Sequence, residues 1–247
     1  MKALTLLKYH GHSLWNWRSS YLGRFLEPVA YLVFLTAGLS GTVGGSPGAC
    51  LAYAMTGLVC FVAFRSATST VGDVANDRKW GILAIYTMQG GSIAGYLLSI
   101  VLFATAVFVG QLAVLVGIGS ALFGFPALGG TPLLLACLTG LLVLIGWVGI
   151  GAAVGAQVQS YSVRDLVVTV TALPIVLSAP LFYSLEAAPR YLQTIAHFNP
   201  LTYQAAWLRT PSGELGLVLL AAGVWALAGL AVAYILLRRA DRVSRER

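Results

Sequence analysis

Residues 93–123, IAGYLLSIVLFATAVFVGQLAVLVGIGSALF, form an apolar stretch without Asp, Glu, Lys, Arg or His. A helix needs about 20 mostly apolar residues to cross a bilayer, and this stretch is longer than that. Five further mostly apolar stretches run over residues 29–43, 50–71, 133–158, 166–182 and 215–237. The sequence therefore predicts an all-α, polytopic membrane protein with six transmembrane helices, in a single transmembrane domain over residues 1–247.

The composition of the whole chain supports this prediction. Hydrophobic residues make up 58% of the 247 residues and charged residues only 9%, whereas soluble domains contain roughly 25% charged residues. The net charge of +7 would suggest a nucleic-acid partner in a soluble protein. Here it is explained by basic flanks that face anionic lipid, so nucleic-acid binding is not expected.

The basic residues are divided unevenly between the two sides of the six-span arrangement. Thirteen of the fifteen Lys and Arg residues fall on the side of the two termini, and only Arg190 and Arg209 fall on the other. Positive charge resists translocation and stays in the cytoplasm. We therefore expect both termini to be cytoplasmic.

The first residues of the chain are too polar for a signal peptide, which needs a continuous apolar core. Leu4, Leu7, Leu14 and Tyr21 recur there at helical spacing. Trp and Tyr side chains in the same segment prefer the membrane interface. We predict an interfacial helix over residues 1–24, and an ordinary juxtamembrane leader is the alternative.

The middle of the six predicted spans lacks the ionisable side chains that couple transport to an ion gradient. No ionisable residue falls midway through the six spans, and Gln111 is the most polar central residue, whereas gradient-driven transporters hold a titratable group there. The sequence also lacks phosphate-binding and hydrolase motifs. Its three cysteines, Cys50, Cys60 and Cys137, lack the spacing of a disulfide framework or a metal site. We expect no catalytic residue, no metal and no cofactor bound by this chain.

The most polar internal segment on the cytoplasmic side is VANDRKWGILAIYTMQGGS, residues 74–92. Asn76 or Asp77 can cap a short helix there, and the pair Gly90–Gly91 can end it. Such a helix presents apolar side chains to the cytosol, which indicates a partner protein. We predict a cytoplasmic helix over residues 76–89, and a loop helix that stays on the membrane is the alternative.

A second unusual segment, residues 181–212, is too polar to cross the membrane and too apolar for a free loop. Asn199–Pro200 is typical of a helix start, with Asn as the cap and Pro in the first helical position. Leu201, Ala205 and Leu208 would then share one face. We predict short re-entrant helices on the outer side, because non-helical backbone at membrane depth must be buried in protein or face water. An ordinary external loop is the alternative.

Two glycine pairs, Gly91 with Gly95 and Gly151 with Gly155, have the spacing that lets helices approach closely in lipid. Such a pair can serve packing within one chain or a contact between two subunits. We favour packing within the chain.

Three motifs carry a resemblance to a known family. One is Asn199-Pro200-Leu201-Thr202-Tyr203 with the later Arg209, which is similar to N-P-[LMF]-[TS]-[YH] followed by Arg. The others are Asp77, Arg78, Gly81 and Leu83, and RFLEPVAYLVFLTAGLSG at residues 24–41. With the order of the elements over essentially the whole chain, they resemble the membrane subunit of type-2 ATP-binding-cassette (ABC) exporters, in particular the bacterial drug and lipo-oligosaccharide exporter branch. Trp80 and Ile82 depart from the family's pattern, in which Thr is more common at the second of these positions.

The resemblance implies a permease subunit that is not itself an enzyme. It implies two copies of an ABC ATPase subunit, which would hold ATP and Mg, and a second permease subunit in a homodimer or related heterodimer. Contacts that couple the permease to the ATPase would come from Asp77, Arg78, Trp80, Gly81 and Leu83. The outer gate would contain Asn199, Pro200, Tyr203 and Arg209. The pathway would be lined by Tyr31, Phe34, Phe61 and Gln111.

The resemblance also implies export across the bacterial cytoplasmic membrane. We expect a hydrophobic drug, antibiotic or lipid-like substrate, as in drug-resistance efflux, with a polysaccharide or lipid-linked glycan as the alternative. Aromatic residues in the first two spans could line either pathway. A protein of another class, such as a secondary carrier, is the remaining alternative.

Overall fold

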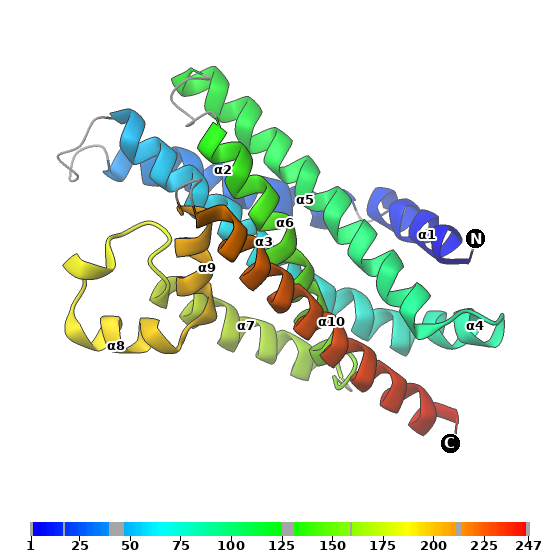
Figure 1. Cartoon of the computed structure of the whole chain (residues 1–247). Coiled ribbons are helices and arrows are strands. Elements are labelled where there is room, and N and C mark those ends of the chain that lie inside the picture. Colours follow the sequence, from blue (N-terminus) through cyan, green and yellow to red (C-terminus); the bar gives the residue numbers. More distant parts are fainter. Residues whose placement is uncertain are drawn as a thin grey trace.

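The computed structural model describes residues 2–16, 18–39, 47–124, 131–158, 160–210 and 214–245. Within these ranges the chain is helical and contains no strand, so the all-α prediction is confirmed for them (Figure 1). In chain order the helices are α1 (Lys2–Asn16), α2 (Arg18–Leu39), α3 (Pro47–Lys79), α4 (Ile82–Met88), α5 (Ile93–Phe123), α6 (Thr131–Gly155), α7 (Tyr161–Ser178), the short 3-10 helix η2 (Leu185–Ala187), α8 (Arg190–Phe198), α9 (Pro200–Leu208) and α10 (Leu215–Arg245).

Among the described residues, five helices are long and apolar enough to cross a membrane. They are α5, α6, α7, the part of α3 over Leu51–Lys79 and the part of α10 over Leu215–Ala240. These five correspond to the second to sixth predicted spans. The predicted first span, residues 29–43, begins in α2 and runs past Leu39 into residues outside the described ranges. A sixth span therefore stays a prediction.

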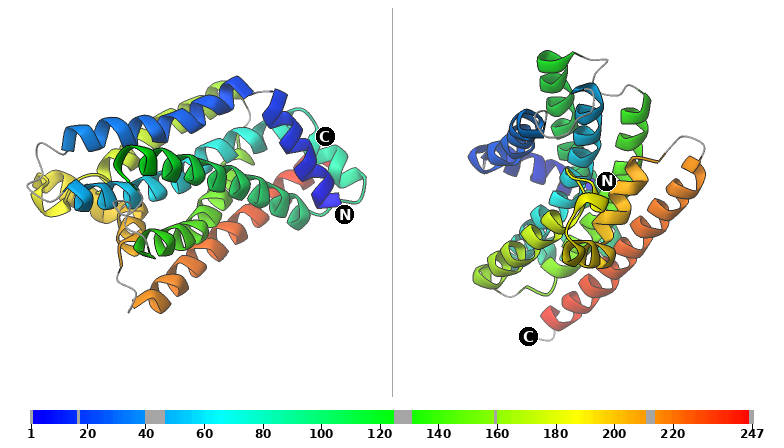
Figure 2. Two further views of the ribbon diagram at one scale, coloured as in Figure 1. Left: turned by 90° about the horizontal axis from the view of Figure 1, so that it is seen from above. Right: turned by 90° about the vertical axis from the view of Figure 1, so that its left-hand side faces the viewer.

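The centre of the molecule is α6, which packs against both α3 and α10 (Figure 2). A Cβ atom on Gly151 would lie 2.3 Å from the Ala67 carbonyl oxygen of α3, and one on Gly149 would lie 2.3 Å from the backbone of Gly229 in α10. Helices in lipid associate through such close packing, because burial from water supplies no driving force there. The pair Gly151 and Gly155 thus serves packing within the chain.

The first 24 residues do not form one helix. α1 ends at Asn16, and residues 18–24 begin α2, which continues to Leu39. α1 packs against α5 with Leu6 and His10, whereas Leu4 of the predicted apolar stripe is exposed. Leu7 and Leu14 of the same stripe are half-buried, and the interfacial location of α1 stays a prediction.

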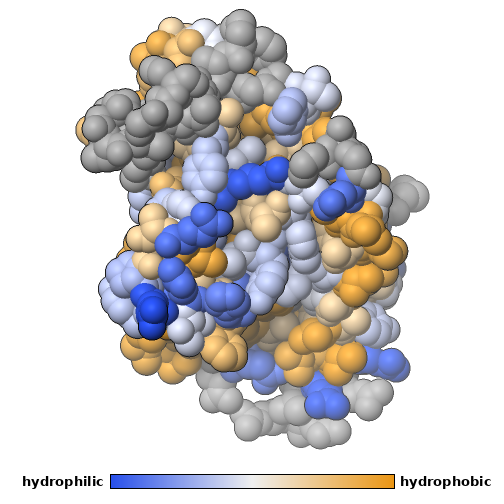
Figure 3. Space-filling model, turned by 60° about the vertical axis from the view of Figure 1, so that its left-hand side comes forward, coloured by the Kyte–Doolittle hydropathy of each residue, from blue (hydrophilic) through white to orange (hydrophobic). Residues whose placement is uncertain are grey.

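Both termini lie at the same end of the molecule as α4, and α8 and α9 lie toward the opposite end (Figure 1). We call these the α4 end and the α9 end. A space-filling view shows hydrophilic residues gathered across the middle of one face, with hydrophobic residues beside them (Figure 3).

Candidate functional sites at the two ends of the molecule

The segment 76–89 is split between two helices by a glycine. α3 continues to Lys79, and Gly81 then takes a left-handed backbone conformation, with φ of 74°, before α4 begins. The residue before α4 is this glycine, which has no side chain to act as a cap. The prediction that Asn76 or Asp77 caps the short helix is therefore wrong, because both residues lie inside the last turns of α3.

The end of α4 agrees with the prediction. Gly90 has φ of 79°, its N–H donates to the Thr87 carbonyl, and the Gly91 N–H donates to the Tyr86 carbonyl, both at 2.9 Å. These two hydrogen bonds form a Schellman motif, in which a glycine in the left-handed region ends the helix. Glycines in this region thus bound α4 on both sides.

α4 has a buried and an exposed face. Leu83 and Tyr86 are buried, and the Tyr86 ring occupies the space where Cβ atoms on Gly91 and Gly95 would lie. On the other face Ile85 is 56% and Met88 is 86% exposed. The predicted coupling residue Leu83 therefore holds α4 in place, and other apolar side chains of α4 form its outer surface.

Asp77, predicted as a coupling residue, faces the protein interior. It is 4% exposed, and its Oδ2 accepts a hydrogen bond of 2.8 Å from the Tyr96 hydroxyl and lies 3.6 Å from His10 Nε2. The neighbouring Arg78 donates from Nη1 to the Ala156 carbonyl. These contacts connect the end of α3 to α1, to α5 and to the residue that follows α6, so both side chains hold the end of α3 in place.

The start of α7 is bound to the end of α3. Trp80 is half-exposed and donates from Nε1 to the Tyr161 hydroxyl at 3.1 Å. The Lys79 ammonium lies 3.5 Å from the centre of the Tyr161 ring. Arg164 donates to Asn76 Oδ1 at 3.2 Å. Trp80 and Gly81, the two remaining predicted coupling residues, thus lie at the joint between α3, α4 and α7.

A cleft of about 560 Å³ lies between α1, α3 and α7 at the α4 end. Polar and aromatic residues make up nearly all of its lining. Its charged residues are Arg24 of α2, Asp73 and Asp77 of α3, and Arg164 and Asp165 of α7. Its aromatic residues are Tyr9, Trp80 and Tyr161, with the His10 ring beside them. A cleft of this size can hold a small molecule.

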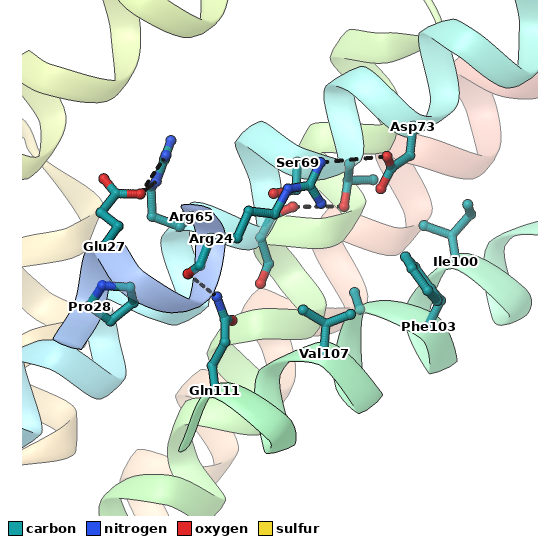
Figure 4. A pocket seen from close by; sticks show the side chains of 13 residues that line it. Arg24, Glu27, Pro28, Arg65, Ser69, Asp73, Ile100, Phe103, Val107 and Gln111 are labelled. Atoms are coloured by element: carbon teal, nitrogen blue, oxygen red, sulfur yellow. Dashed lines mark hydrogen bonds and ion pairs between the residues drawn. The ribbon is translucent and has the colours of Figure 1, made fainter. Parts of the chain in front are cut away.

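A smaller cavity of about 60 Å³ lies between α2, α3 and α5 (Figure 4). Arg65 donates two hydrogen bonds to Glu27 Oε2, at 2.7 and 3.1 Å, in its wall. Gln111, predicted to line the pathway, donates from Nε2 to the Arg24 carbonyl at 2.8 Å. The cavity shares Arg24, Ser69 and Asp73 with the larger cleft, so the same polar face of α3 lines both.

The other predicted pathway residues do not join Gln111. The Tyr31 ring packs edge-on against Phe61 at 5.0 Å and stacks on Phe182 at 6.1 Å. Phe61 is buried, and Phe34 is exposed. The structure therefore brings two of the four residues together in an aromatic cluster and leaves the other two apart from it.

Asn199 caps α9 as predicted. Its Oδ1 accepts a hydrogen bond of 2.9 Å from the Leu201 N–H, and Pro200 occupies the first helical turn. Its Nδ2 also donates to the Ile175 carbonyl at 2.6 Å and to Ser178 Oγ at 2.9 Å. Asn199 therefore joins the start of α9 to the last turn of α7, a role that the capping pattern did not predict.

The apolar face predicted for α9 is buried. Leu201, Ala205 and Leu208 pack into the core, and α9 contacts both α3 and α6. Tyr203 points away from this face and donates from its hydroxyl to the His197 carbonyl at 2.9 Å.

Arg209 follows α9 and hydrogen-bonds the backbone beyond the end of α7. Its Nη1 donates to the Pro180 carbonyl at 2.8 Å and its Nη2 to the Leu181 carbonyl at 2.7 Å. The guanidinium lies 3.6 Å from the centre of the Tyr53 ring, and the Tyr53 hydroxyl donates to the Tyr183 carbonyl at 2.8 Å. Burial lowers the pKa of Arg209, but a guanidinium remains charged in proteins.

The side-chain donors of Asn199, Arg209 and Tyr53 satisfy backbone carbonyls at and beyond the end of α7. Where a helix stops, its last carbonyls lose their partners, and in a membrane protein such groups must be satisfied internally. The α3 backbone also comes close to this segment, since a Cβ on Gly57 would lie 2.1 Å from the Leu181 carbonyl oxygen. Asn199, Arg209 and Tyr53 thus fix the break after α7 against α3 and α9.

Several residues of both sites were not predicted from the sequence. Asp73, Asn76 and Asp77 recur at the spacing of one helix face, and that pattern could have indicated the wall of the cleft. No comparable signal pointed to Tyr96 or Tyr53, because their partners come from distant helices or from the backbone.

A sequence model of the ABC-2 type transporter family matches residues 2–210. The matched range extends from α1 through α9, so it contains both of the sites described above. A search of curated proteins finds no significant match.

Proposed function

This chain belongs to the ABC-2 type transporter family, and from that membership we propose that it exports a hydrophobic drug, antibiotic or lipid-like substrate. The family's membrane domain is the permease component of an ABC transporter and not its ATPase. A separate ABC ATPase is therefore a partner of this multi-pass membrane protein. Membership also decides against a secondary carrier.

We propose that α4 receives force from the ATPase. The observation that carries this proposal is the exposed face of α4. Ile85 and Met88 are exposed there, and Trp80, just before α4 in the chain, is half-exposed. Apolar side chains gathered on a surface indicate an interaction site. Behind α4, Asp77 and Arg78 connect the end of α3 to α1, to α5 and to the residue that follows α6, so a displacement of α4 would be passed to the transmembrane helices.

The proposed outer gate consists of α8, α9 and the backbone that follows α7. Trp147 of α6 donates from Nε1 to Gln204 Oε1 at 2.7 Å, and Gln204 is fully buried. A polar contact this far inside the bundle supports the proposal that α9 re-enters the membrane. Asn199, Pro200, Tyr203 and Arg209 would set the closed position of the gate.

The proposed assembly contains two permease subunits and two ATPase subunits. α7 supports a second permease copy, because it is the least buried of the five long apolar helices, with 11% of its most apolar window buried within the chain. α2, α3 and α7 would surround the pathway, and the cleft at the α4 end would be its cytoplasmic opening. A lipid-linked glycan is a second candidate substrate, since hydroxyl groups on α3 could bind a sugar.

Transport itself tests the proposal. Inside-out vesicles that contain this chain and its ATPase should accumulate a lipophilic dye when ATP is added, and vanadate should stop the accumulation. Accumulation in right-side-out vesicles would indicate import, and accumulation without ATP would overturn the proposed mechanism.

The proposed orientation can be tested separately. Cysteines would be introduced at Met88 and at Glu186, both exposed and at opposite ends of the molecule, in a variant without the native cysteines. A membrane-impermeant thiol reagent added to intact cells should label the cysteine at 186 and spare the cysteine at 88. The reverse pattern would place α4 outside the cell and end its proposed role.

A further inference from the structure

The cleft between α1, α3 and α7 holds an unequal set of charges. Arg24 pairs with Asp73 at 3.9 Å, and Arg164 pairs with Asp165 at 2.7 Å. The third carboxylate of the lining, Asp77, forms no ion pair with Lys or Arg within the described ranges, and contacts a hydroxyl and a histidine ring instead. Both arginines of the lining are therefore engaged, and one carboxylate is left over.

His10 lies beside this carboxylate and has an unused nitrogen. The residue is 5% exposed, and its Nε2 makes no hydrogen bond to the described part of the chain. Buried polar atoms without a partner are uncommon. Burial also lowers the pKa of His10 to about 4, so the ring is neutral near pH 7 and one of its two nitrogens is a hydrogen-bond acceptor.

The two atoms define the chemistry of a missing partner. Asp77 Oδ2 and His10 Nε2 are 3.6 Å apart, and both can accept a hydrogen bond when the imidazole carries its proton on Nδ1. One ammonium group can donate to both atoms. A carboxylate or phosphate would place further acceptor atoms against these two acceptors and find both arginines already paired.

The rim of the cleft suits the rest of such a ligand. Tyr9, Trp80 and Tyr161 come from three different elements, and all three lining residues are partly exposed. The hydrogen bond between Trp80 and Tyr161 holds two of the rings together. The Tyr161 ring already has the Lys79 ammonium 3.5 Å from its centre, so the rings offer the ligand apolar contact area rather than a second site for its cation.

We propose that this cleft binds the substrate as a protonated amine on an apolar body, with the ammonium group between Asp77 and His10 and the apolar body against Trp80 and Tyr161. The inference rests on the proposed function, because it names the substrate class that would occupy the cytoplasmic opening of the export pathway.

Binding of dansylcadaverine, a fluorescent primary amine, to the purified full-length chain in detergent tests this inference. The matched anion, dansyl-aminohexanoate, has the same ring system and a carboxylate in place of the amine. The amine should bind about tenfold more tightly or better, which is the ratio that ~1.4 kcal/mol provides. Equal affinity for the two probes would overturn the proposal.

Two variants assign the binding to these residues. Asp77→Asn keeps an acceptor for the Tyr96 hydroxyl and removes the charge, and it should weaken amine binding about tenfold. Trp80→Leu, at a half-exposed position, should weaken it about threefold through loss of the aromatic surface that contacts the apolar body, and it provides a second test if Asp77→Asn fails to fold. Glu186→Gln removes an exposed carboxylate at the α9 end and should bind like the wild type. Unchanged affinity in folded Asp77→Asn or in Trp80→Leu would overturn the assignment.

The amine site and the proposed export function can fail independently, and the experiments distinguish the two failures. Amine binding that depends on Asp77 without an ATPase that co-purifies would support the site and contradict export. ATP-driven transport of another substrate without amine binding would support export and contradict the site.

Discussion

The two ends of the molecule hold their polar side chains in different ways. At the α9 end, Asn199 and Arg209 donate to backbone carbonyls between Ile175 and Leu181. At the α4 end, Asp77 and Trp80 bind side chains of other helices, and Arg78 adds one contact to a backbone carbonyl, that of Ala156. Backbone carbonyls stay where the fold puts them, whereas a side chain can change partner when its helix moves. The difference indicates a fixed joint at one end and an exchangeable set of contacts at the other.

The largest effect is expected at the fixed joint, from Arg209→Ala. The substitution leaves the Leu181 carbonyl without its donor, whereas the Pro180 carbonyl still accepts from the Tyr53 hydroxyl at 3.2 Å. One buried unsatisfied group costs about 1–3 kcal/mol, so the free energy of unfolding should fall by about that amount in SDS titrations of the protein in mixed micelles. Arg190→Ala, at an exposed position on α8, should change it little. A loss of the same size in both variants would show that the hydrogen bonds of Arg209 do not account for the stability of this joint.

A second prediction separates the two roles of Asn199. Asn199→Ser keeps an oxygen that can cap α9 and removes the amide donor to Ile175 and Ser178, whereas Asn199→Ala removes both functions. Loss of the cap alone destabilises a helix by about 1 kcal/mol. The alanine variant should therefore be less stable than the serine variant by about that amount in the same titrations. Equal stability would mean that the cap contributes nothing at this joint.

The third prediction concerns the exposed surface at the α4 end. Ile85→Ser combined with Met88→Ser should reduce co-purification of the ATPase about tenfold, equivalent to ~1.4 kcal/mol. The free energy of unfolding should change little, because surface substitutions usually stay within about 0.5 kcal/mol. Leu122→Ser alters an exposed apolar residue on the far end of α5 and serves as the control. Normal ATPase binding by the double variant would remove the main support for docking at α4.

The smallest expected effect is a dependence of stability on pH through His10. Burial lowers its pKa from 6.5 to about 4, although Asp77 Oδ2 at 3.6 Å would favour the protonated ring. That distance exceeds a hydrogen bond and the ring is buried against Phe103, so burial dominates. Between the two pKa values only the unfolded state binds the proton, so stability is complete above pH 6.5 and falls as the pH drops toward 4.

The measurement compares wild type with His10→Gln. The stability difference between the two proteins should shift by about 1 kcal/mol from about pH 7.5 to about pH 5.5. Subtracting the variant removes the contribution of other groups that titrate in this range. A difference that stays constant with pH would show that the ring is not kept neutral by its surroundings.

Local chemistry could be predicted from the sequence where the partner is close along the chain. The cap at Asn199 and the stop at Gly90 depend on neighbours two to four residues away, and both are confirmed. The cap expected at Asn76 or Asp77 is wrong because nothing in the local sequence reveals that α3 continues through them. Hydropathy found the five long helices but not the point at which the long helix turns into α4.

Contacts between distant segments could not be predicted in the same way. Arg209 was singled out as part of an outer gate, yet its partners are carbonyls near residue 180, and every residue has a carbonyl. Asp77 was expected to face a partner, and its burial against Tyr96 depends on how α5 packs on α3. In both cases the residue type indicated importance, and only the packing of the helices identified what it binds.

The joint at Gly81 has a consequence for protein chemistry. Its φ of 74° is unfavourable for an L-amino acid, yet a Cβ there would meet no atom within 4 Å in the described structure. Chirality alone, and not space, therefore selects glycine at this position. A D-alanine introduced by semisynthesis would favour this left-handed conformation and stiffen the elbow between α3 and α4, whereas an L-alanine would oppose the same bend.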